Sequence, residues 1–199
     1  MARRDEWTPA DGEAFATLLA AAHANAPWAF ERLFTIYAPR VRAYVRTRGS
    51  AEPDELTNDV FFAVFASLAG FTGDEAAFRS WTFTIARNRL VDEHRRRSRQ
   101  VVTVAAGAIG HDDTVGGDVE AEALANIGSD WVVDVLSGLA PDQRDVLLLR
   151  VVADCTIDQI ADILGKRRGA VKALQRRGLA AAKRILNGQA VPLDQPADV

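Results

Sequence analysis

The sequence predicts an all-α protein of two small helical domains joined by a flexible acidic linker. Apolar residues recur every three or four positions along most of the chain, which is the spacing of an amphipathic helix. Good helix formers, above all Ala, Leu, Arg and Glu, dominate the composition. One segment rich in Gly and Asp, residues 99–128, interrupts the helical pattern. These three observations give the fold class and the division into domains.

The first domain covers about residues 10–98 and contains four helical patterns. The first pattern is residues 11–25. The second, residues 27–49, begins with Pro27, which suits a first helical turn because an N–H at that position would lack a partner anyway. Pro39 lies inside this second pattern, and we expect it to kink or split the helix because it removes a backbone hydrogen bond.

The second half of this domain contains the other two patterns. Gly49 is expected to end the preceding helix. The third pattern, residues 50–71, starts with Ser50, Pro53 and three acidic residues, all of which suit a helix N-terminus. The fourth pattern, residues 74–99, is expected to end in a run of arginines.

The linker, residues 99–128, contains the clusters GHDD and VGGD, which favour a loop over a helix. Residues 101–134 carry seven acidic residues and no Lys or Arg. The linker is therefore expected to be an acidic tether. Residues 187–199 contain two prolines and no periodicity, so we expect a disordered tail.

The second domain covers about residues 129–186. A short helix is expected before the pattern that begins with Pro141. Thr156 then stands at an N-cap, and the apolar helix that it opens is expected to end at Gly165. A basic helix follows. Two short helices joined by a Gly-containing turn, with positive charge on the second, are typical of a helix-turn-helix.

Positive charge is concentrated in this last helix. The chain has 24 basic and 27 acidic residues overall, yet residues 164–186 contain eight basic residues and no acid. Such a helix suits the phosphates of DNA, because release of condensed counterions drives the binding. The alternative is a helix face that is merely solvated. The eight residues are Lys166, Arg167, Arg168, Lys172, Arg176, Arg177, Lys183 and Arg184.

The chain resembles the bacterial extracytoplasmic-function (ECF, group IV) sigma factors. LAPDQRDVLLLRVVADCTIDQIADILGKRRGAVKALQRRGLAAAKRIL resembles their promoter-binding C-terminal domain. AFERLFTIYAPRVRAYVRTRG, PDELTNDVFFAVFASLAGF and FRSWTFTIARNRLVDEHRRR resemble their N-terminal domain. The resemblance implies a sigma factor that directs RNA polymerase core to specific promoters and helps open the −10 region. It implies neither enzymatic activity nor a cofactor.

The stretch DELTNDVFF, residues 54–62, matches the family's polymerase-binding helix. The resemblance implies that this helix faces the β′ clamp helices of the core enzyme. Asn58 replaces the commoner Gln, which keeps the amide but shortens its reach. The alternative is that the acidic residues only complement the helix dipole. The residues assigned to this surface are Glu55, Asn58, Asp59 and Phe62.

Residues 69–97 match the family's −10 promoter segment. The resemblance implies a loop that receives an extruded base, followed by a helix that flanks the opened strand. Trp81 is interpreted as a core residue, and the run Arg95–Arg97 is alternatively a solvated helix end. Phe83 is left open between core packing and base stacking. The residues assigned to −10 DNA are Phe71, Asp74, Arg79, Phe83, Arg87, Asn88, Arg95 and Arg96.

The stretch GKRRGAVKALQRR, residues 165–177, matches the family's −35 recognition helix. Leu174 stands where many relatives have Arg. Arginine is the best base reader because its fork bonds O6 and N7 of guanine, but the sequence does not divide these side chains between bases and phosphates. The residues assigned to −35 DNA are Arg167, Arg168, Lys172, Gln175 and Arg176.

The partners implied by the resemblance are core RNA polymerase, through its β′ clamp helices and β flap, promoter DNA, and an anti-sigma factor. The acidic linker would occupy the RNA exit path, or would simply be solvated. The main alternative is a two-domain helix-turn-helix regulator that binds duplex DNA without polymerase. Cys155 is either a small buried residue or a redox handle. Because no apolar run is long enough for a signal peptide or a membrane span, we expect a soluble, cytoplasmic protein.

Overall fold

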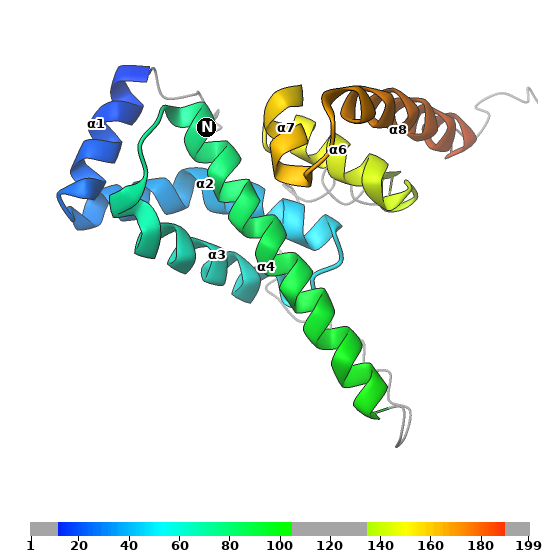
Figure 1. Cartoon of the computed structure of the whole chain (residues 1–199), viewed down its shortest axis with the longest axis horizontal. Helices are drawn as coiled ribbons and strands as arrows, with labels where there is room; N and C mark the ends of the chain where they lie inside the picture. The colour runs from blue at the N-terminus through cyan, green and yellow to red at the C-terminus, as the bar shows by residue number, and fades with distance from the viewer. Residues whose placement is uncertain (1–11, 105–134, 190–199) are drawn as a thin grey trace, which may run out of the picture.

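The computed structural model describes residues 12–104 and 135–189, and Figure 1 shows how their helices are arranged. All regular elements in these two ranges are helical, which confirms the predicted all-α class. The helices are α1 (Gly12–His23), α2 (Pro27–Thr47), α3 (Pro53–Ser67), the short 3-10 helix η1 (Leu68–Gly70), α4 (Glu75–Val104), α6 (Pro141–Val151), α7 (Ile157–Leu164) and α8 (Arg168–Gln189). The helix expected before Pro141 lies largely outside the described residues. We call α1–α4 domain one and α6–α8 domain two.

Domain one is built around a cluster of aromatic side chains at the start of α4. Phe78 is fully buried, and its ring centroid lies 5.6 Å from that of Phe15 in α1, 5.1 Å from Tyr37 in α2 and 5.5 Å from Phe71. Aromatic pairs at such distances add to the stability that burial of their apolar area supplies. One side chain therefore joins α1, α2, α4 and the loop before α4.

Helix α2 corrects one of the two outcomes expected at Pro39, because the helix is not split there. The helix runs without interruption from Pro27 to Thr47, with Pro27 in the first turn as expected. Tyr37 and Val41, which flank Pro39, are buried, whereas Pro39 itself is exposed. Burial of the opposite face thus holds the helix together although one backbone hydrogen bond is missing.

The ends of α2 and α4 test two predicted boundaries. Gly49 has a φ of +82° and follows α2, as expected for a helix-ending glycine. In contrast, α4 continues to Val104, six residues beyond the predicted domain end at residue 98. Residues 99–104 contain no Gly or Pro to stop the helix. They therefore belong to α4 rather than to the linker, and residues 105–128 lie outside the described residues.

Domain two forms as the sequence predicts. The Thr156 hydroxyl accepts a hydrogen bond from the Gln159 N–H, and the Gln159 side chain accepts one from the Thr156 N–H, which makes a capping box at the start of α7. Gly165 ends α7 with a φ of +63°. Helix α8 then crosses α6 closely, because a Cβ on Gly178 would lie only 3.1 Å from Leu147 Cδ1.

Domain two lies against domain one on the side of α4, with α7 beside the first half of that helix (Figure 1). The second half of α4 extends past both domains. In the part of the chain that the structure describes, no helix is long and apolar enough to cross a membrane.

Candidate polymerase and nucleic-acid interfaces

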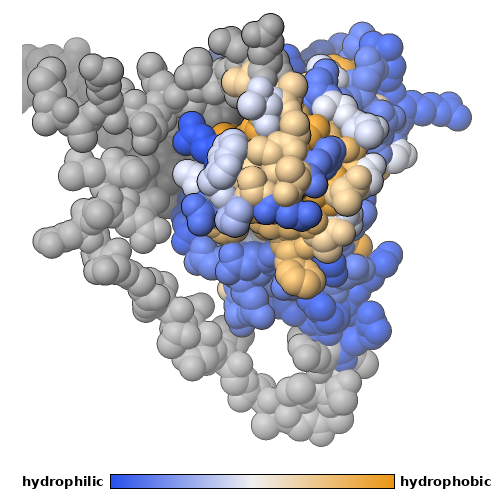
Figure 2. Space-filling view, turned by 90° about the vertical axis from the view of Figure 1, so that its left-hand side faces the viewer, coloured by the Kyte–Doolittle hydropathy of each residue, from blue (hydrophilic) through white to orange (hydrophobic). Residues whose placement is uncertain are grey.

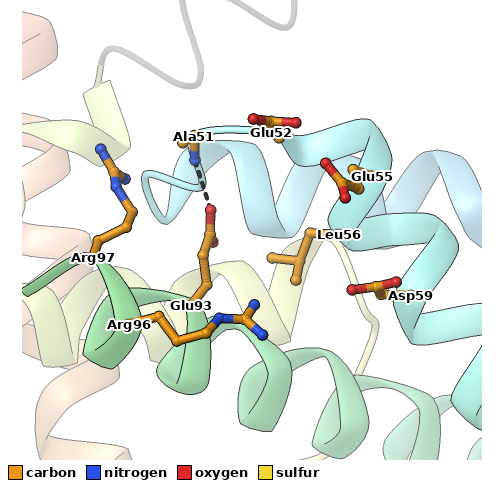
Figure 3. A pocket seen from close by; sticks show the side chains of 8 residues that line it. All are labelled: Ala51, Glu52, Glu55, Leu56, Asp59, Glu93, Arg96 and Arg97. Carbon is orange, nitrogen blue, oxygen red and sulfur yellow. Dashed lines mark hydrogen bonds between the residues drawn. The ribbon is translucent and has the colours of Figure 1, made fainter. Parts of the chain in front are cut away.

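An acidic groove of about 370 Å³ lies between α3 and α4. Figure 3 shows Glu52, Glu55 and Asp59 on the α3 side and Arg96 on the α4 side, with Leu56 at the base between them. Glu93 Oε1 accepts a hydrogen bond of 3.0 Å from the Ala51 N–H. This hydrogen bond holds the entry to α3 against α4 at one end of the groove.

The acidic residues at the start of α3 have different environments. A hydrogen bond with Glu52 and the charge of that neighbour raise the pKa of Glu55, whose side chain is in solvent. Asp54 forms an ion pair with Arg42, and this contact lowers the pKa of Asp54. Asp54 is thus occupied within domain one, whereas Glu55 faces outward among like charges and would gain from a cationic partner.

The four residues assigned to polymerase binding share one exposed stripe of α3. Glu55 lies three residues before Asn58 and four before Asp59, and Phe62 lies four and three residues after them, so all four side chains share one helix face. All four are exposed, and Phe62 is 77% exposed. The opposite face of the helix is buried. The stripe consists of Glu55, Asn58, Asp59 and Phe62, and we call it the α3 stripe.

Other large apolar side chains of domain one are also exposed, including Trp28 at 55% and Phe34 at 38%. Figure 2 shows apolar surface surrounded by hydrophilic residues at the end of the molecule where α1 lies. Domain one therefore presents hydrophobic as well as charged contact area. Large exposed apolar patches mark sites that interact with proteins, membranes or ligands.

The loop before α4 is fixed by a stacked aromatic pair and a helix cap. The rings of Phe71 and Trp81 are stacked with centroids 4.9 Å apart and planes 20° apart. The Asp74 carboxylate accepts a 2.8 Å hydrogen bond from the Ala77 N–H, so Asp74 caps α4. A Cβ on Gly73 would lie 2.9 Å from Ala77 Cβ, so the tight turn requires glycine. Phe71 and Trp81 remain partly exposed.

Two residues assigned to −10 DNA do not reach the surface. Phe83 is fully buried and packs edge-on against Tyr44, with centroids 5.5 Å apart, so it is a core residue and the stacking alternative is wrong. Arg79 is only 8% exposed, because its guanidinium lies between Glu75, at 3.8 Å, and Asp154 of domain two, at 3.4 Å. In this arrangement of the domains Arg79 cannot contact DNA.

The remaining −10 residues lie along α4. Asn88, Arg95 and Arg96 are exposed, and Arg87 is partly buried. Arg95 lies 3.7 Å from Asp92, a contact between two exposed side chains that contributes little to stability. The solvent-facing side of α4 therefore keeps cations available to a nucleic-acid strand.

Helix α8 presents the −35 residues on one face. Arg168, Lys172 and Arg176 follow at four-residue spacing and are all exposed, as is Arg167 in the preceding turn. Gln175 is partly buried. Leu174 is only 8% exposed and packs into the core of domain two. The residue that departs from many relatives therefore faces inward, and its lack of charge leaves the exposed face intact.

Ion pairs within domain two hold the turn before α8. Lys166 Nζ lies 2.9 Å from an Asp142 carboxylate oxygen, and Arg168 pairs with Asp158. Both acids belong to α6 or α7, so the two cations are positioned against the rest of the domain. Exposed pairs of this kind are weak, and a phosphate can displace them.

Comparison with known proteins assigns the family. Residues 33–100 match the family described as Sigma-70 region 2, and residues 129–181 match Sigma-70, region 4. The ECF RNA polymerase sigma factor SigK of Mycolicibacterium vanbaalenii is 31% identical, over 74% of this chain and 77% of that protein. The chain belongs to the ECF sigma factors. Proteins of this family direct RNA polymerase to promoters for transcription initiation.

Another relative of this sigma factor is the ECF RNA polymerase sigma factor BldN of Streptomyces coelicolor, 30% identical over 85% of this chain. The chain spans 64% of the length of BldN. The region 2 match includes most of α2 and all of α3, together with α4 as far as residue 100. The region 4 match includes α6, α7 and most of α8.

Solved sigma factors share the fold of this sigma factor. CnrH, solved in complex with the cytosolic domain of CnrY, matches with a TM-score of 0.61 and 20% identity, over 88% of this chain and 99% of CnrH. RpoE of Bartonella quintana, solved with the anti-sigma factor NepR, matches with a TM-score of 0.60 and 20% identity, over 80% of this chain and 98% of RpoE. At this identity the likeness shows the fold.

Contacts between the two domains are the feature of this sigma factor that sequence reasoning missed. They involve Arg48, Asp145, Asp154 and Gln159. Each of these residues also suits an exposed position in a helix or turn. No pattern in the sequence therefore distinguishes a residue at the domain interface from one in solvent. In the described part of the chain, no group of three or more His, Cys, Asp or Glu residues is placed to hold a metal ion.

Proposed function

We propose that this sigma factor binds core RNA polymerase through the α3 stripe and reads −35 promoter DNA with α8, while the loop before α4 and the exposed face of α4 open the −10 region. The observation that carries the proposal is the separation of charge on two exposed helix faces. The α3 stripe is acidic and apolar, whereas the exposed face of α8 is basic and has no acid. One chain thus offers separate faces to a protein and to DNA.

The α3 stripe suits the β′ clamp helices as a partner. Glu55 and Asp59 supply negative charge beside the groove, and Phe62 supplies an exposed aromatic anchor. Aromatic anchors surrounded by polar residues are typical of the energetic centres of protein interfaces. A helix with cations at similar spacing would satisfy the crowded carboxylates of Glu52 and Glu55.

The α8 face suits a major groove. Arg168, Lys172 and Arg176 project from one side of a helix that follows a short helix and a tight turn. A recognition helix of this kind enters the groove while the preceding helix stays outside it. We assign the phosphate and base contacts of the −35 element to these three residues together with Arg167 and Gln175.

The loop before α4 suits the capture of an unstacked base. Phe71 and Trp81 offer partly exposed aromatic area held in a fixed position. Unstacking costs a few kcal/mol per base, and stacking on an aromatic side chain returns about 1–3 kcal/mol. Asn88, Arg95 and Arg96 would then hold the strand along α4.

We also infer an anti-sigma factor as a regulatory partner, because RpoE was solved with the anti-sigma factor NepR and CnrH with the cytosolic domain of CnrY. The apolar surface of domain one supports a protein partner of this kind. As expected of an initiation factor, the proposal includes no covalent chemistry. The site of action would be the cytoplasm, where the polymerase is found.

The experiment compares binding and transcription in one set of variants. The double variant Glu55→Ala with Asn58→Ala should weaken core polymerase binding in a pull-down by about tenfold or more, since truncation at interface centres costs about 2 kcal/mol or more. Run-off transcription should fall in parallel. Glu31→Ala, which removes an exposed acid on α2, is the matched control.

A regulator that binds duplex DNA alone would behave differently. Its wild-type chain would bind promoter duplex without core polymerase and would give no polymerase-dependent transcript. If the double variant Glu55→Ala with Asn58→Ala kept wild-type affinity for core polymerase, the α3 stripe would not be the polymerase-binding surface.

A further inference from the structure

The exposed face of α8 repeats the pattern of the α3 stripe with the opposite charge. The α3 stripe presents an acid, an amide, an acid and an aromatic ring at positions i, i+3, i+4 and i+7 of its helix. At the same spacing, α8 presents a lysine, an amide, an arginine and a leucine. We call this second set the α8 stripe, and it consists of Lys172, Gln175, Arg176 and Leu179.

Each stripe lies on one side of its helix and is open to solvent. Four residues at this spacing fall within an arc of about 100°, the width of one helix face. Lys172 and Arg176 are exposed, Leu179 is 54% exposed, and Gln175 is partly buried. Among the described residues, neither Lys172 nor Arg176 has an ion-pair partner. The charges and the leucine of the α8 stripe are therefore available to a partner.

A parallel alignment of α3 and α8 brings complementary side chains together along the whole of both stripes. Two of the resulting pairs join opposite charges, and one joins two apolar side chains. The fourth joins two amides, each of which has both a donor and an acceptor. An antiparallel alignment would instead set Phe62 against Lys172. The four parallel pairs are Glu55 with Lys172, Asn58 with Gln175, Asp59 with Arg176 and Phe62 with Leu179.

The two stripes of one chain do not meet. In Figure 1, α3 and α8 lie on opposite sides of the molecule. The contacts between them run through two other helices, because α3 packs on α4, α4 on α7 and α7 on α8. A stripe that pairs with its complement therefore finds it on another molecule.

We propose that a second copy of this chain is the partner, with the α8 stripe of one copy docked in parallel on the α3 stripe of another. Charge complementarity at matched spacing supports this occupant, and the contact would also cover Phe62 and Leu179. One contact leaves a stripe of each kind unused, so association of this head-to-tail type continues as the protein concentration rises. The inference goes beyond the proposed function, since neither polymerase nor DNA takes part in the contact.

The contact should be weak and sensitive to salt. Exposed ion pairs contribute little each, and salt at 0.1 M screens charges that are more than about 10 Å apart. Arg96 lies across the groove from Asp59 and opposes the approach of a cationic helix (Figure 3). Arg168, one turn before Lys172, already pairs with Asp158. We therefore expect self-association at high protein concentration and low ionic strength.

The test is sedimentation of the free full chain at increasing concentration, after removal of nucleic acid. One variant, Glu55→Lys with Asp59→Lys, makes both stripes basic. A second variant, Lys172→Glu with Arg176→Glu, makes both stripes acidic. All four substituted side chains are exposed, so both variants should fold, and circular dichroism checks this.

The average mass of the wild-type chain should rise with concentration at low salt and fall when salt is added. Each reversed variant alone should associate at least about tenfold more weakly, because two attractive pairs become repulsive. An equal mixture of the two variants should associate again. In the mixture, the basic α3 stripe of one variant meets the acidic α8 stripe of the other.

Two control variants make the same charge changes away from the stripes. Glu31→Lys with Asp162→Lys alters exposed positions of α2 and α7, and Arg177→Glu with Arg184→Glu alters another exposed face of α8. Each control should associate like the wild-type chain, and their mixture should associate no more strongly. Controls that lose association as the reversed variants do would show that net charge governs it, which overturns the proposal.

Two further results would also overturn it. One is a wild-type chain that stays monomeric at every concentration in low salt. The other is a mixture of the reversed variants that associates no more than its components. Failure of the proposed function has a different signature, because the wild-type chain would then not bind core polymerase, whereas sedimentation of the free chain would still report on self-association.

Discussion

Phe61 and Phe62 are adjacent in the sequence but have opposite environments. Phe61 is 2% exposed and packs against Phe34 and Phe65, whereas Phe62 is 77% exposed. The helical period explains the difference, because neighbouring residues point about 100° apart. The motif DELTNDVFF assigned Phe62 to polymerase binding, and the structure places this side chain on the surface, where a partner protein can reach it.

The two phenylalanines should therefore separate stability from binding. Phe61→Ala should lower the free energy of unfolding by about 3–5 kcal/mol, the usual cost of truncating a buried aromatic side chain. Phe62→Ala should change it by less than about 0.5 kcal/mol but weaken polymerase binding. Urea unfolding and a polymerase pull-down measure the two effects. A large decrease in stability in Phe62→Ala would contradict this assignment.

Cys155 is a buried core residue rather than a redox handle. It is fully buried, and burial raises its thiol pKa to about 11. The thiolate is the reactive form, so at neutral pH the folded chain offers almost none of it. Its buried position in domain two makes this sulfur a small hydrophobe.

A thiol reagent should therefore label Cys155 only after unfolding. Because the folded pKa is raised, the neutral thiol stabilises the fold below the ordinary pKa near 9, and this contribution disappears as pH rises toward about 11. Reaction with a chromogenic disulfide at pH 7, with and without denaturant, measures the accessibility. Rapid labelling of the native chain would restore the redox alternative.

At the scale of single elements, helix caps were predictable, whereas helix lengths were less so. Thr156 and Gly165 start and end α7 as the sequence indicates, because caps depend only on nearby residues. The split considered at Pro39 did not occur, and α4 continues beyond its expected end. In α2, packing of the buried face outweighs the defect at Pro39, and packing is not visible in a local pattern.

Helix α8 should control promoter affinity without affecting the polymerase. Replacing Arg168 and Lys172 with Ala should weaken −35 duplex binding. The dependence of log affinity on log salt should become shallower by about one for each phosphate-binding side chain that is removed. Fluorescence anisotropy at several salt concentrations measures both quantities. Polymerase binding should stay at the wild-type level, and a parallel decrease would contradict the separation of the two faces.

Replacement of Leu174 with Arg supplies a second comparison within α8. Leu174 is buried, so this change should destabilise domain two rather than add a DNA contact. Thermal unfolding and duplex binding measure the two effects. A stable Leu174→Arg variant with tighter duplex binding would show that this position faces the groove after all.

At the scale of the whole molecule, the contact between the domains decides which assigned residues are accessible. Arg79 is buried between Glu75 and Asp154 of domain two, whereas Arg168, Lys172 and Arg176 of α8 are exposed in the same arrangement. The residues assigned to −10 DNA and those assigned to −35 DNA therefore differ in exposure.

The sequence by itself determined the helical class, the caps, the two-domain order and the family, because periodicity, capping and motifs depend on residues close together in the chain. It also identified the exposed charges of α8. Tertiary structure decided which of the assigned residues are accessible. Phe83 is in the core, and Arg79 lies between Glu75 and Asp154. The physical reason is that burial and ion pairing join segments far apart in sequence, and a sequence pattern does not show which cation meets which anion.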